Sequence, residues 1–298
     1  MPSPIISSPH NHRPPPRPRP AHLSLSPGEI YGLLGPNGAG KTTTINLICH
    51  LLAPDAGAIA IAGQPVSEAT KRLVGIVPQK DLLYGSLTCA ENLNFFAQLY
   101  GLPRRERRGR IEQCLAGVNL GDRAHSLVES LSGGMKRRLS IALALVHQPK
   151  LVILDEPTTG LDIEARYELW ELIRQLKVQG VTVMLTTHLL EEAERLCDRI
   201  GILRQGQLLG EGSLADLRQT IPAAMIAQLD CPDEAALLAR AQTLGWPTRR
   251  YGSGLALWLP EALDLPGLLA ELEGIAVQSA ALQPVRLEHI YLEITRQP

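Results

Sequence analysis

The chain has 298 residues, of which 45% are hydrophobic and 20% are charged, a mix typical of a globular protein that buries a sizeable core. Its formal net charge is -1, which argues against nucleic acid as the main partner, because neutralising phosphates needs a basic surplus. No apolar run approaches the roughly 18–20 residues of a membrane-spanning helix. The five cysteines are dispersed without a CxxC pair, which predicts reduced thiols and a cytoplasmic protein.

Residues 1–20 are rich in proline and arginine and contain no acidic residue. Proline lacks a backbone donor and favours extended conformers, so this segment is predicted to be a disordered tail. Residues 21–213 differ, because short apolar runs alternate there with helical patterns. Such alternation is typical of an α/β domain with a mostly parallel sheet covered by helices. The runs predicted as buried strands lie at 29–34, 72–77, 150–155, 181–187 and 199–203.

Two further regions depart from this alternation. Residues from about 87 to 140 have a helical pattern throughout, which predicts a helical subdomain inserted into the α/β core. Residues 214–298 are predicted to form a small C-terminal α+β module with the element order β-α-β-β-α-β. This is the order of a ferredoxin-like fold.

The stretch GPNGAGKT, at 35–42, matches the G-x-x-x-x-G-K-[ST] pattern of a phosphate-binding loop. It follows a predicted strand and opens a predicted helix, so its backbone N–H groups and the helix N-terminus can face one anion. Lys41 is expected to reach the β- and γ-phosphates of a nucleotide, and the Thr42 hydroxyl to ligate Mg²⁺. Kinases, GTPases and motor ATPases share this pattern, so by itself it indicates only a nucleoside triphosphate. The residues assigned to nucleotide binding in this stretch are Gly35, Pro36, Asn37, Gly38, Ala39, Gly40, Lys41, Thr42 and Thr43.

The stretch KLVILDE, at 150–156, places Asp155 and Glu156 at the carboxyl end of a predicted buried strand. Ligands of open α/β sheets bind at that edge. Unpaired carboxylates are costly to bury, so two of them ending an apolar strand indicate a functional role. Asp155 is expected to hold Mg²⁺ through water, and Glu156 to polarise the attacking water as a general base.

A second anion cradle is predicted in LSGGM, at 131–135, where Ser132, Gly133 and Gly134 precede an apolar helical run. A hydroxyl, flexible backbone N–H groups and a helix N-terminus meet there. One γ-phosphate does not need two such cradles from the same subunit. The simplest interpretation is that this cradle faces the nucleotide held by another copy of the chain.

Together these motifs resemble those of ABC transporter ATPases, with GPNGAGKT as Walker A, LSGGM as the signature and LVILDEPT as Walker B. The resemblance adds Gln79 as the Q-loop residue, Asp162 in the D-loop and His188 as the switch histidine. It implies that Gln79 contacts Mg²⁺ and the attacking water, and that His188 hydrogen-bonds the γ-phosphate. ATP and Mg²⁺ are then the cofactors. The implied catalytic residues are Glu156, His188 and Gln79, and the implied metal ligands are Thr42, Gln79 and Asp155.

The resemblance also implies partners, because one cassette without a membrane span is similar to the ATPase subunits of multi-chain transporters. It implies a homodimer or paired cassette with composite ATP sites, and a separate permease. Segment 87–103 resembles that of drug- and polysaccharide-type exporter ATPases, and segment 285–297 is similar to the closing helix of the daunorubicin-resistance-type subgroup. Together they imply export through an ABC-2-type permease. The expected location is cytoplasmic, on the inner face of the cell membrane, and no nucleic-acid partner is expected.

The N-terminal part departs from the family pattern. Family members usually begin with another pair of strands and an aromatic residue that stacks on adenine, yet nothing aromatic precedes Tyr31 here. We therefore expect an N-terminally incomplete cassette that holds adenine weakly, unless Tyr31 or a partner chain supplies the platform. Two alternatives to an export motor are a soluble ABC-type ATPase acting on nucleic acid or ribosomes, and an impaired cassette with a regulatory role.

Overall fold

The predicted parallel sheet forms the centre of the structure, a computed structural model that describes residues 22–251 and 254–296. Within these residues the sheet has six strands in the order β4-β5-β6-β1-β7-β8. Neighbouring strands are parallel except for β8, which pairs antiparallel with β7. The tail predicted at 1–20 lies outside the described residues. The strands are β1 (Ile30–Leu34), β4 (Val74–Val77), β5 (Leu151–Asp155), β6 (Thr182–Thr187), β7 (Arg199–Arg204) and β8 (Gln207–Gly212).

All five predicted apolar runs lie in this sheet as parallel strands, and their ends differ from the prediction by at most two residues. The predicted α/β fold with a mostly parallel sheet is therefore confirmed. The edge strand β8 was not predicted. Exposed and half-buried residues follow one another along it, and it contains Gly210 and Gly212, so it lacks the apolar run of a buried strand.

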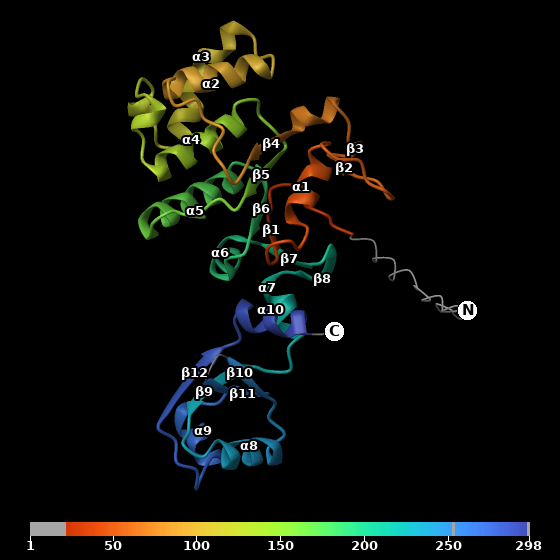
Figure 1. The fold of residues 1–298 in the computed structure, drawn as a ribbon, viewed down its shortest axis with the longest axis vertical. Helices are drawn as coiled ribbons and strands as arrows, with labels where there is room; N and C mark the ends of the chain where they lie inside the picture. The colour runs from red at the N-terminus through yellow and green to blue at the C-terminus, as the bar shows by residue number, and fades with distance from the viewer. Residues whose placement is uncertain (1–21, 252–253, 297–298) are drawn as a thin grey trace, which may run out of the picture.

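Helices cover the sheet and form the predicted helical insertion. α2, α3 and α4 pack together at one end of the molecule (Figure 1). α2 begins at a capping box in which the side chains of Thr88 and Glu91 each bind the other's backbone N–H. The chain between α3 and α4 consists of loop and two 3₁₀ turns, so residues 87–140 are less continuously helical than predicted. These helices are α1 (Lys41–Ile48), α2 (Cys89–Leu99), α3 (Arg104–Gly117), α4 (Gly133–Leu145), α5 (Ile163–Val178) and α6 (Leu190–Leu196).

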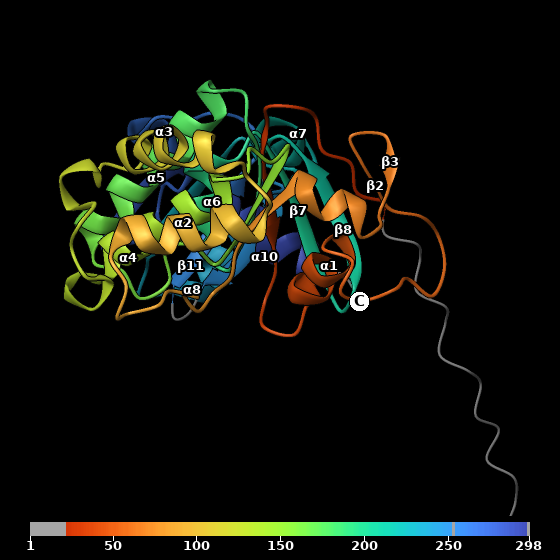
Figure 2. The same cartoon turned by 90° about the horizontal axis from the view of Figure 1, so that it is seen from above.

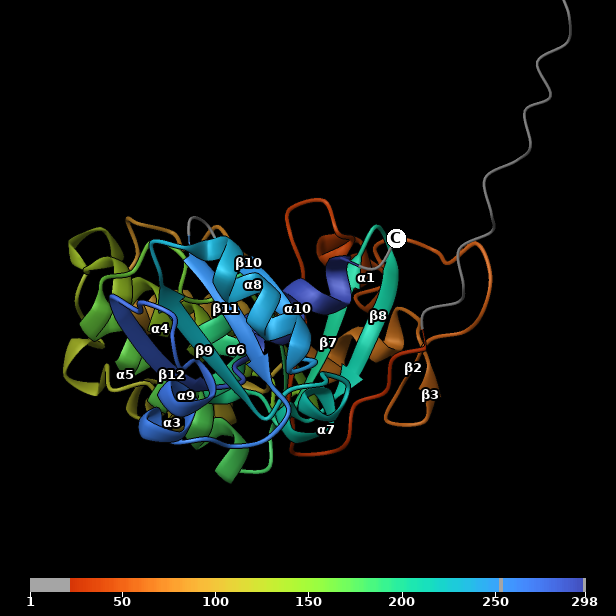
Figure 3. The ribbon, with the colours of Figure 1, turned by 90° about the horizontal axis from the view of Figure 1, so that it is seen from below.

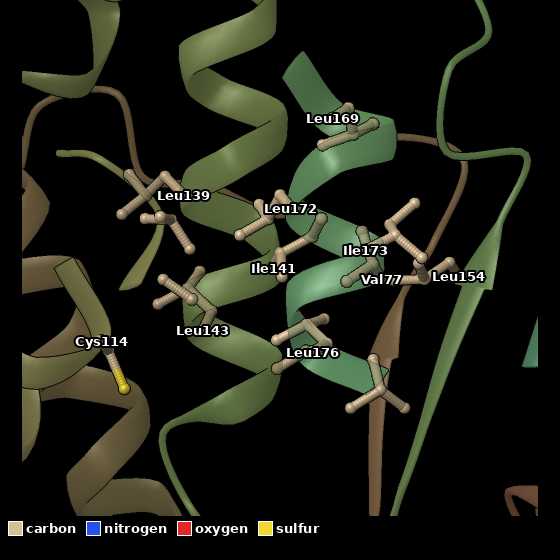
Figure 4. Packing of buried hydrophobic residues seen from close by; sticks show 14 of the residues in the cluster. Val77, Cys114, Leu139, Ile141, Leu143, Leu154, Leu169, Leu172, Ile173 and Leu176 are labelled. Atoms are coloured by element: carbon tan, nitrogen blue, oxygen red, sulfur yellow. The ribbon is translucent and has the colours of Figure 1, made fainter. Parts of the chain in front are cut away.

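Apolar side chains on both faces hold the sheet in place. Ile45 of α1 packs in a cluster on one face. On the other face, Val77 of β4 and Leu154 of β5 join a larger cluster with α4 and α5. Figure 4 shows Ile141 of α4 and Ile173 of α5 beside these strand residues. Each buried aliphatic side chain contributes about 1.5–3 kcal/mol, so this packing holds the helices against both faces of the sheet.

A second sheet follows in the C-terminal part, with the strand order β10-β11-β9-β12 and antiparallel neighbours. The element order β-α-β-β-α-β agrees with the ferredoxin-like prediction. Figure 3 shows α8 and α9 lying over one face of this sheet. The elements are α7 (Leu214–Gln219), β9 (Met225–Asp230), α8 (Glu234–Thr243), β10 (Thr248–Tyr251), β11 (Gly254–Leu259), α9 (Leu265–Glu271), β12 (Ser279–Pro284) and α10 (Leu287–Arg296).

The last helix, α10, lies between the two sheets (Figure 1). On one side Glu293 forms a two-pronged ion pair with Arg249 of β10, at 2.6 and 2.9 Å. On the other side the backbone oxygen of Thr295 accepts a hydrogen bond from Arg204, at the end of β7. An apolar cluster that includes Ile290 of α10 and Trp258 of β11 also contains residues of the central sheet. The two sheets therefore share one continuous core through α10.

Little regular structure is present in residues 22–29, before β1, and in residues 49–68, after α1. A two-stranded hairpin, β2 (Ala60–Ile61) and β3 (Gln64–Pro65), lies on the opposite side of the molecule from α5 (Figure 2). Residues 22–29 form no strand, although Leu23 and Leu25 pack against the cluster around β1. Across residues 22–251 and 254–296, no helix is both long enough and apolar enough to cross a membrane.

Candidate active site

The predicted phosphate loop connects β1 to α1 and curls as glycine permits. Gly38 and Gly40 have φ angles of 78° and 111°, which L side chains rarely adopt. α1 begins at Lys41 without a side-chain cap on its first turn, so its free N–H groups face the loop. A loop and a helix N-terminus arranged in this way form an anion site. Pro36, Asn37, Gly38, Thr42 and Thr43 are exposed at this place, whereas Gly35 and Ala39 are buried.

The turn between β7 and β8 packs against the phosphate loop, a contact that the sequence did not predict. Gly206 donates its N–H to the Ala39 oxygen at 2.8 Å. A Cβ atom on Gly35 would lie 2.5 Å from the Leu203 oxygen, so only glycine fits there. The β7–β8 turn therefore helps to hold the phosphate loop in position at the end of β1.

Lys41 is buried within the loop that it follows. Its Nζ donates to the backbone oxygens of Gly35 at 2.7 Å and of Pro36 at 3.2 Å. The same Nζ lies 3.7 Å from Oε1 of Glu156. The ammonium thus lies between the phosphate loop and the carboxylate predicted as the general base.

Glu156 is the point at which the predicted catalytic side chains meet. Its Oε2 accepts hydrogen bonds from Gln79 Nε2 at 3.0 Å and from Thr159 Oγ1 at 3.3 Å. Its Oε1 lies 3.2 Å from Nδ1 of His188, on the side of the carboxylate that also faces Lys41. Three residues predicted from separate motifs therefore converge on one carboxylate, which comes from the end of β5.

Asp155, the last residue of β5, is half-buried beside this cluster. Its Oδ1 accepts a hydrogen bond from Thr186 Oγ1 at 2.5 Å, and Thr186 also accepts the backbone N–H of Glu156. The Asp155 carboxylate, the exposed Thr42 hydroxyl and the Gln79 amide supply oxygen ligands, which Mg²⁺ prefers. The donor set therefore fits the predicted magnesium.

The predicted signature residues lie apart from this cluster. Ser132 caps α4 and accepts the N–H of Met135 at 3.3 Å. Asp162 caps α5 in the same manner and accepts the N–H of Ala165 at 2.8 Å. Between residues 22 and 251, and from 254 to 296, no hydrogen bond or ion pair joins either side chain to Glu156.

The two signature glycines have different reasons to be glycine. A Cβ atom on Gly134 would lie 2.9 Å from the Cβ of Ala165, so close packing between α4 and α5 accounts for Gly134. A Cβ atom on Gly133 would meet nothing within 4 Å. Packing therefore explains why residue 134 is glycine, and only Gly133 still requires the predicted role in an anion cradle. The same packing places the signature beside Asp162.

A buried arginine near the site was not predicted. Arg137 of α4 is 5% exposed and donates to backbone oxygens on both sides of Glu156. In the sequence, Arg137 is one of three consecutive basic residues in the helical run MKRRLSIALAL. Nothing in that pattern distinguishes it from Lys136 and Arg138.

Tyr31 does not provide the adenine platform considered for it. Its side chain is 0% exposed within β1, and burial raises the pKa of its hydroxyl. It is the aromatic member of the apolar cluster around the phosphate loop. A base bound at the surface of the site cannot stack on a ring that is fully buried.

Comparisons with known proteins place these motifs in one family. Residues 19–159 match the family model described as ABC transporter. The chain is 40% identical over 276 residues to Nod factor export ATP-binding protein I of Burkholderia thailandensis, covering 91% of this chain and 89% of that protein. It is 45% identical over 222 residues to linearmycin resistance ATP-binding protein LnrL of Bacillus subtilis, covering 73% and 71%.

Solved structures agree with this likeness. The fold is similar to that of an ATP-binding subunit of an ABC transporter, with a TM-score of 0.60, 36% identity and coverage of 68% of this chain and 86% of that one. It is also similar to a dimeric ATP-binding cassette in a post-hydrolysis state with ADP and Pi, with a TM-score of 0.58 and 29% identity, over 66% and 90% of the chains.

Proposed function

Because the chain belongs to the ABC transporter family and is an ATPase of that family, we propose that it is the motor subunit of an ABC-2-type exporter. It pairs with a second cassette and energises a separate permease from the inner face of the cell membrane. One observation carries this proposal: Lys41, Gln79 and His188 all meet at the Glu156 carboxylate. The two relatives described above are named as ATP-binding proteins for Nod factor export and for linearmycin resistance, which supports an export direction.

The geometry suggests how the site responds to ATP. Lys41 and His188 both face Oε1 of Glu156. A γ-phosphate bound at the loop offers these two donors a stronger acceptor, since charge-assisted hydrogen bonds to phosphate are favourable. Oε1 is then released to accept a proton from the attacking water, while Gln79 orients that water from the other side.

The metal belongs to the same proposal. Thr42, Asp155 and Gln79 are the residues that would hold Mg²⁺, which supplies charge neutralisation to the phosphates when it is bound. Thr186 orients the Asp155 carboxylate through the 2.5 Å hydrogen bond and leaves its other oxygen available. The protein's own part is therefore to present oxygen ligands at the sheet edge beside the phosphate loop.

The separation of the signature from Glu156 supports a site shared by two copies. Ser132 and Gly133 lie at the exposed start of α4, and Asp162 lies beside them through the packing of Gly134 on Ala165. Within residues 22–251 and 254–296, no hydrogen bond or ion pair joins this surface to Glu156 of its own chain. We infer that it closes over the nucleotide of an opposing cassette, which gives the dimer two composite ATP sites.

The packing around α10 also bears on how the chain divides into domains. We propose that residues 21–213 form the cassette, with residues 87–140 as its helical subdomain, and that residues 214–298 form an accessory domain. The shared core around α10 supports a rigid attachment of that domain to the cassette.

An exposed apolar surface that begins a few residues after Gln79 in the chain supports a permease partner. We call it the Q-loop patch; Tyr84 and Phe95 touch edge to face there, with ring centres 5.1 Å apart. Exposed apolar patches of this kind mark interaction surfaces. Its members are Leu82, Tyr84, Phe95 and Leu99, which are 64%, 48%, 42% and 70% exposed.

The test is co-purification of the tagged chain from membranes of cells that express it with a candidate ABC-2-type permease. The proposal predicts a stable complex whose ATPase activity exceeds that of the isolated chain. Leu82→Ser with Phe95→Ser should weaken the complex and leave the isolated ATPase intact. Leu265→Ser with Leu269→Ser, which alters apolar residues 42% and 43% exposed on α9, is the matched control. Recovery with ribosomes or nucleic acid instead of membranes would favour the soluble alternative.

A further inference from the structure

The guanidinium of Arg137 is engaged on all of its nitrogen atoms. Nε donates to the Pro157 oxygen at 2.8 Å, and Nη2 to the Asp155 oxygen at 2.8 Å and the Glu156 oxygen at 3.3 Å. Nη1 donates to the Pro78 oxygen at 2.6 Å. One buried side chain thus binds three consecutive carbonyls that surround the general base.

Those carbonyls belong to a strained turn. Glu156 has a φ angle of 46°, which is uncommon for a residue other than glycine. Such a conformation persists only where the surrounding structure determines it. On one side the Glu156 N–H is held by Thr186, and on the other side Arg137 holds the carbonyls. The direction of the Glu156 side chain follows from these two sets of bonds.

Arg137 also ties this turn to the signature helix. It lies in α4, which begins directly after Ser132. Its Nη1 binds the carbonyl that precedes Gln79 and also lies 3.3 Å from Oδ1 of Asp81. Ser140, one turn further along α4, donates to the same Asp81 oxygen at 2.8 Å. A shift of α4 must therefore either carry the Glu156 and Gln79 segments along or break these bonds.

We propose that Arg137 is a positioning residue that holds Glu156 in its productive orientation and makes that orientation depend on the place of the signature helix. The planar fork matters, because its three nitrogen atoms reach four backbone oxygens in fixed, diverging directions, whereas the three donors of an ammonium all lie on one nitrogen. Arg138, the next residue of α4, provides the comparison. Its guanidinium lies 3.7 Å from Glu168, and in the part of the chain that the structure describes it forms no hydrogen bond or ion pair with the turn around Glu156.

The first test separates turnover from binding. Arg137→Met should lower kcat by about 10- to 100-fold, a part of what a general base contributes, and keep KM for ATP within about threefold. The reason is that the phosphate loop is untouched. Arg138→Met should leave both values within about twofold. An unchanged kcat for Arg137→Met, or a KM that rises in proportion to the loss of kcat, would overturn the proposal.

The second test shows whether Arg137 acts through Glu156. In a Glu156→Gln background, adding Arg137→Met should change the residual rate by no more than about twofold, because residues that act as one unit are not additive. A further loss as large as that of the single variant would mean that Arg137 has an independent role.

The third test covers the case in which Arg137→Met folds poorly. Arg137→Lys keeps the buried charge and should preserve the thermal midpoint more fully than Arg137→Met. Its kcat should nevertheless stay below about one third of the original value, since a single ammonium nitrogen cannot reach the oxygens of Pro78, Asp155, Glu156 and Pro157 that the three guanidinium nitrogens bind. Full recovery of kcat with lysine would contradict the requirement for the fork.

Discussion

The Oε1 atom of Glu156 lies 3.2 Å from Nδ1 of His188. The two residues follow β5 and β6, which are parallel neighbours with Asp155 paired to Thr186. Side chains that follow adjacent parallel strands emerge at one edge of the sheet. Lys41 reaches the same oxygen from the loop after β1. Strand register thus brings these groups together, and each can be tested separately.

Glu156→Gln should keep ATP binding and lower hydrolysis by roughly 10²–10⁴-fold, because glutamine preserves size and hydrogen bonding but accepts no proton. With ATP present, this variant should accumulate as a dimer, measured by phosphate release and size-exclusion chromatography. Glu168→Gln, on an exposed face of α5, is the control for the loss of one carboxylate. Nearly unchanged turnover would show that another group is the base.

Lys41→Ala should weaken binding of the triphosphate itself, since it removes a charge-assisted contact worth about 1.5–3 kcal/mol, or roughly 10- to 150-fold in affinity. Fluorescent nucleotide titration measures this directly. His188→Ala should lower kcat and should weaken binding of the triphosphate less than Lys41→Ala does, because Lys41 also contacts the phosphate loop whereas His188 contacts Glu156. Equal effects on binding from both variants would contradict this division of roles.

Tyr31 should contribute nothing to discrimination between bases. Stacking on an aromatic ring contributes about 1–3 kcal/mol, or roughly 5- to 150-fold in affinity, and Tyr31 is buried and cannot supply it. Tyr31→Leu should therefore leave the ratio of the ATP and GTP affinities within about twofold of its original value, because the phosphate contacts do not distinguish bases. Competition titrations of the two nucleotides, repeated after addition of the permease, measure the difference. Strong preference for ATP in the isolated chain would mean that another surface holds adenine.

The attachment of α10 should depend on pH. The hydrogen bond from Arg249, above all, lowers the pKa of Glu293, so the pair stabilises the fold above the unfolded pKa of about 4.3 and loses that contribution as pH falls through the lower folded pKa. Arg249→Gln should reduce the free energy of unfolding by about 1–3 kcal/mol at pH 7. This difference should shrink between about pH 5 and pH 3 in denaturant titrations.

The neighbouring Arg250 provides the control for that experiment. It lies on the same strand, but its ion pair with Glu234 is exposed, so Arg250→Gln should cost less than about 1 kcal/mol. A difference between the original chain and Arg249→Gln that stays constant down to pH 3 would contradict the role assigned to Glu293.

The central sheet and the residues at its edge could be predicted because each motif carries its own local geometry. Gly38 and Gly40 allow the loop, Lys41 opens the helix, and the apolar run before Asp155 places that residue at the end of a strand. Parallel strand order then brings the motifs together. The meeting of Gln79 with Glu156 followed from the resemblance to a family and not from spacing.

Arg137 could not be predicted from a pattern, because its partners are backbone oxygens 18 to 20 and 59 residues away. Backbone acceptors leave no signature in a sequence. The packing of Gly134 on Ala165 was hidden for the same reason, since it depends on how closely two helices approach. The edge strand β8 lacks an apolar run and was missed on that account.

The most direct measurement of the shared-site account mixes two inactive variants. Ser132→Arg blocks the signature surface but keeps Lys41, and Lys41→Ala keeps the signature but loses the phosphate-loop ammonium. Each alone should be inactive as a homodimer. A mixed dimer contains one intact composite site, so an equal mixture should recover about a quarter of the original ATPase activity, because half of the dimers are mixed and each has one working site of two. Complete absence of activity in mixed dimers isolated with two affinity tags would contradict the account.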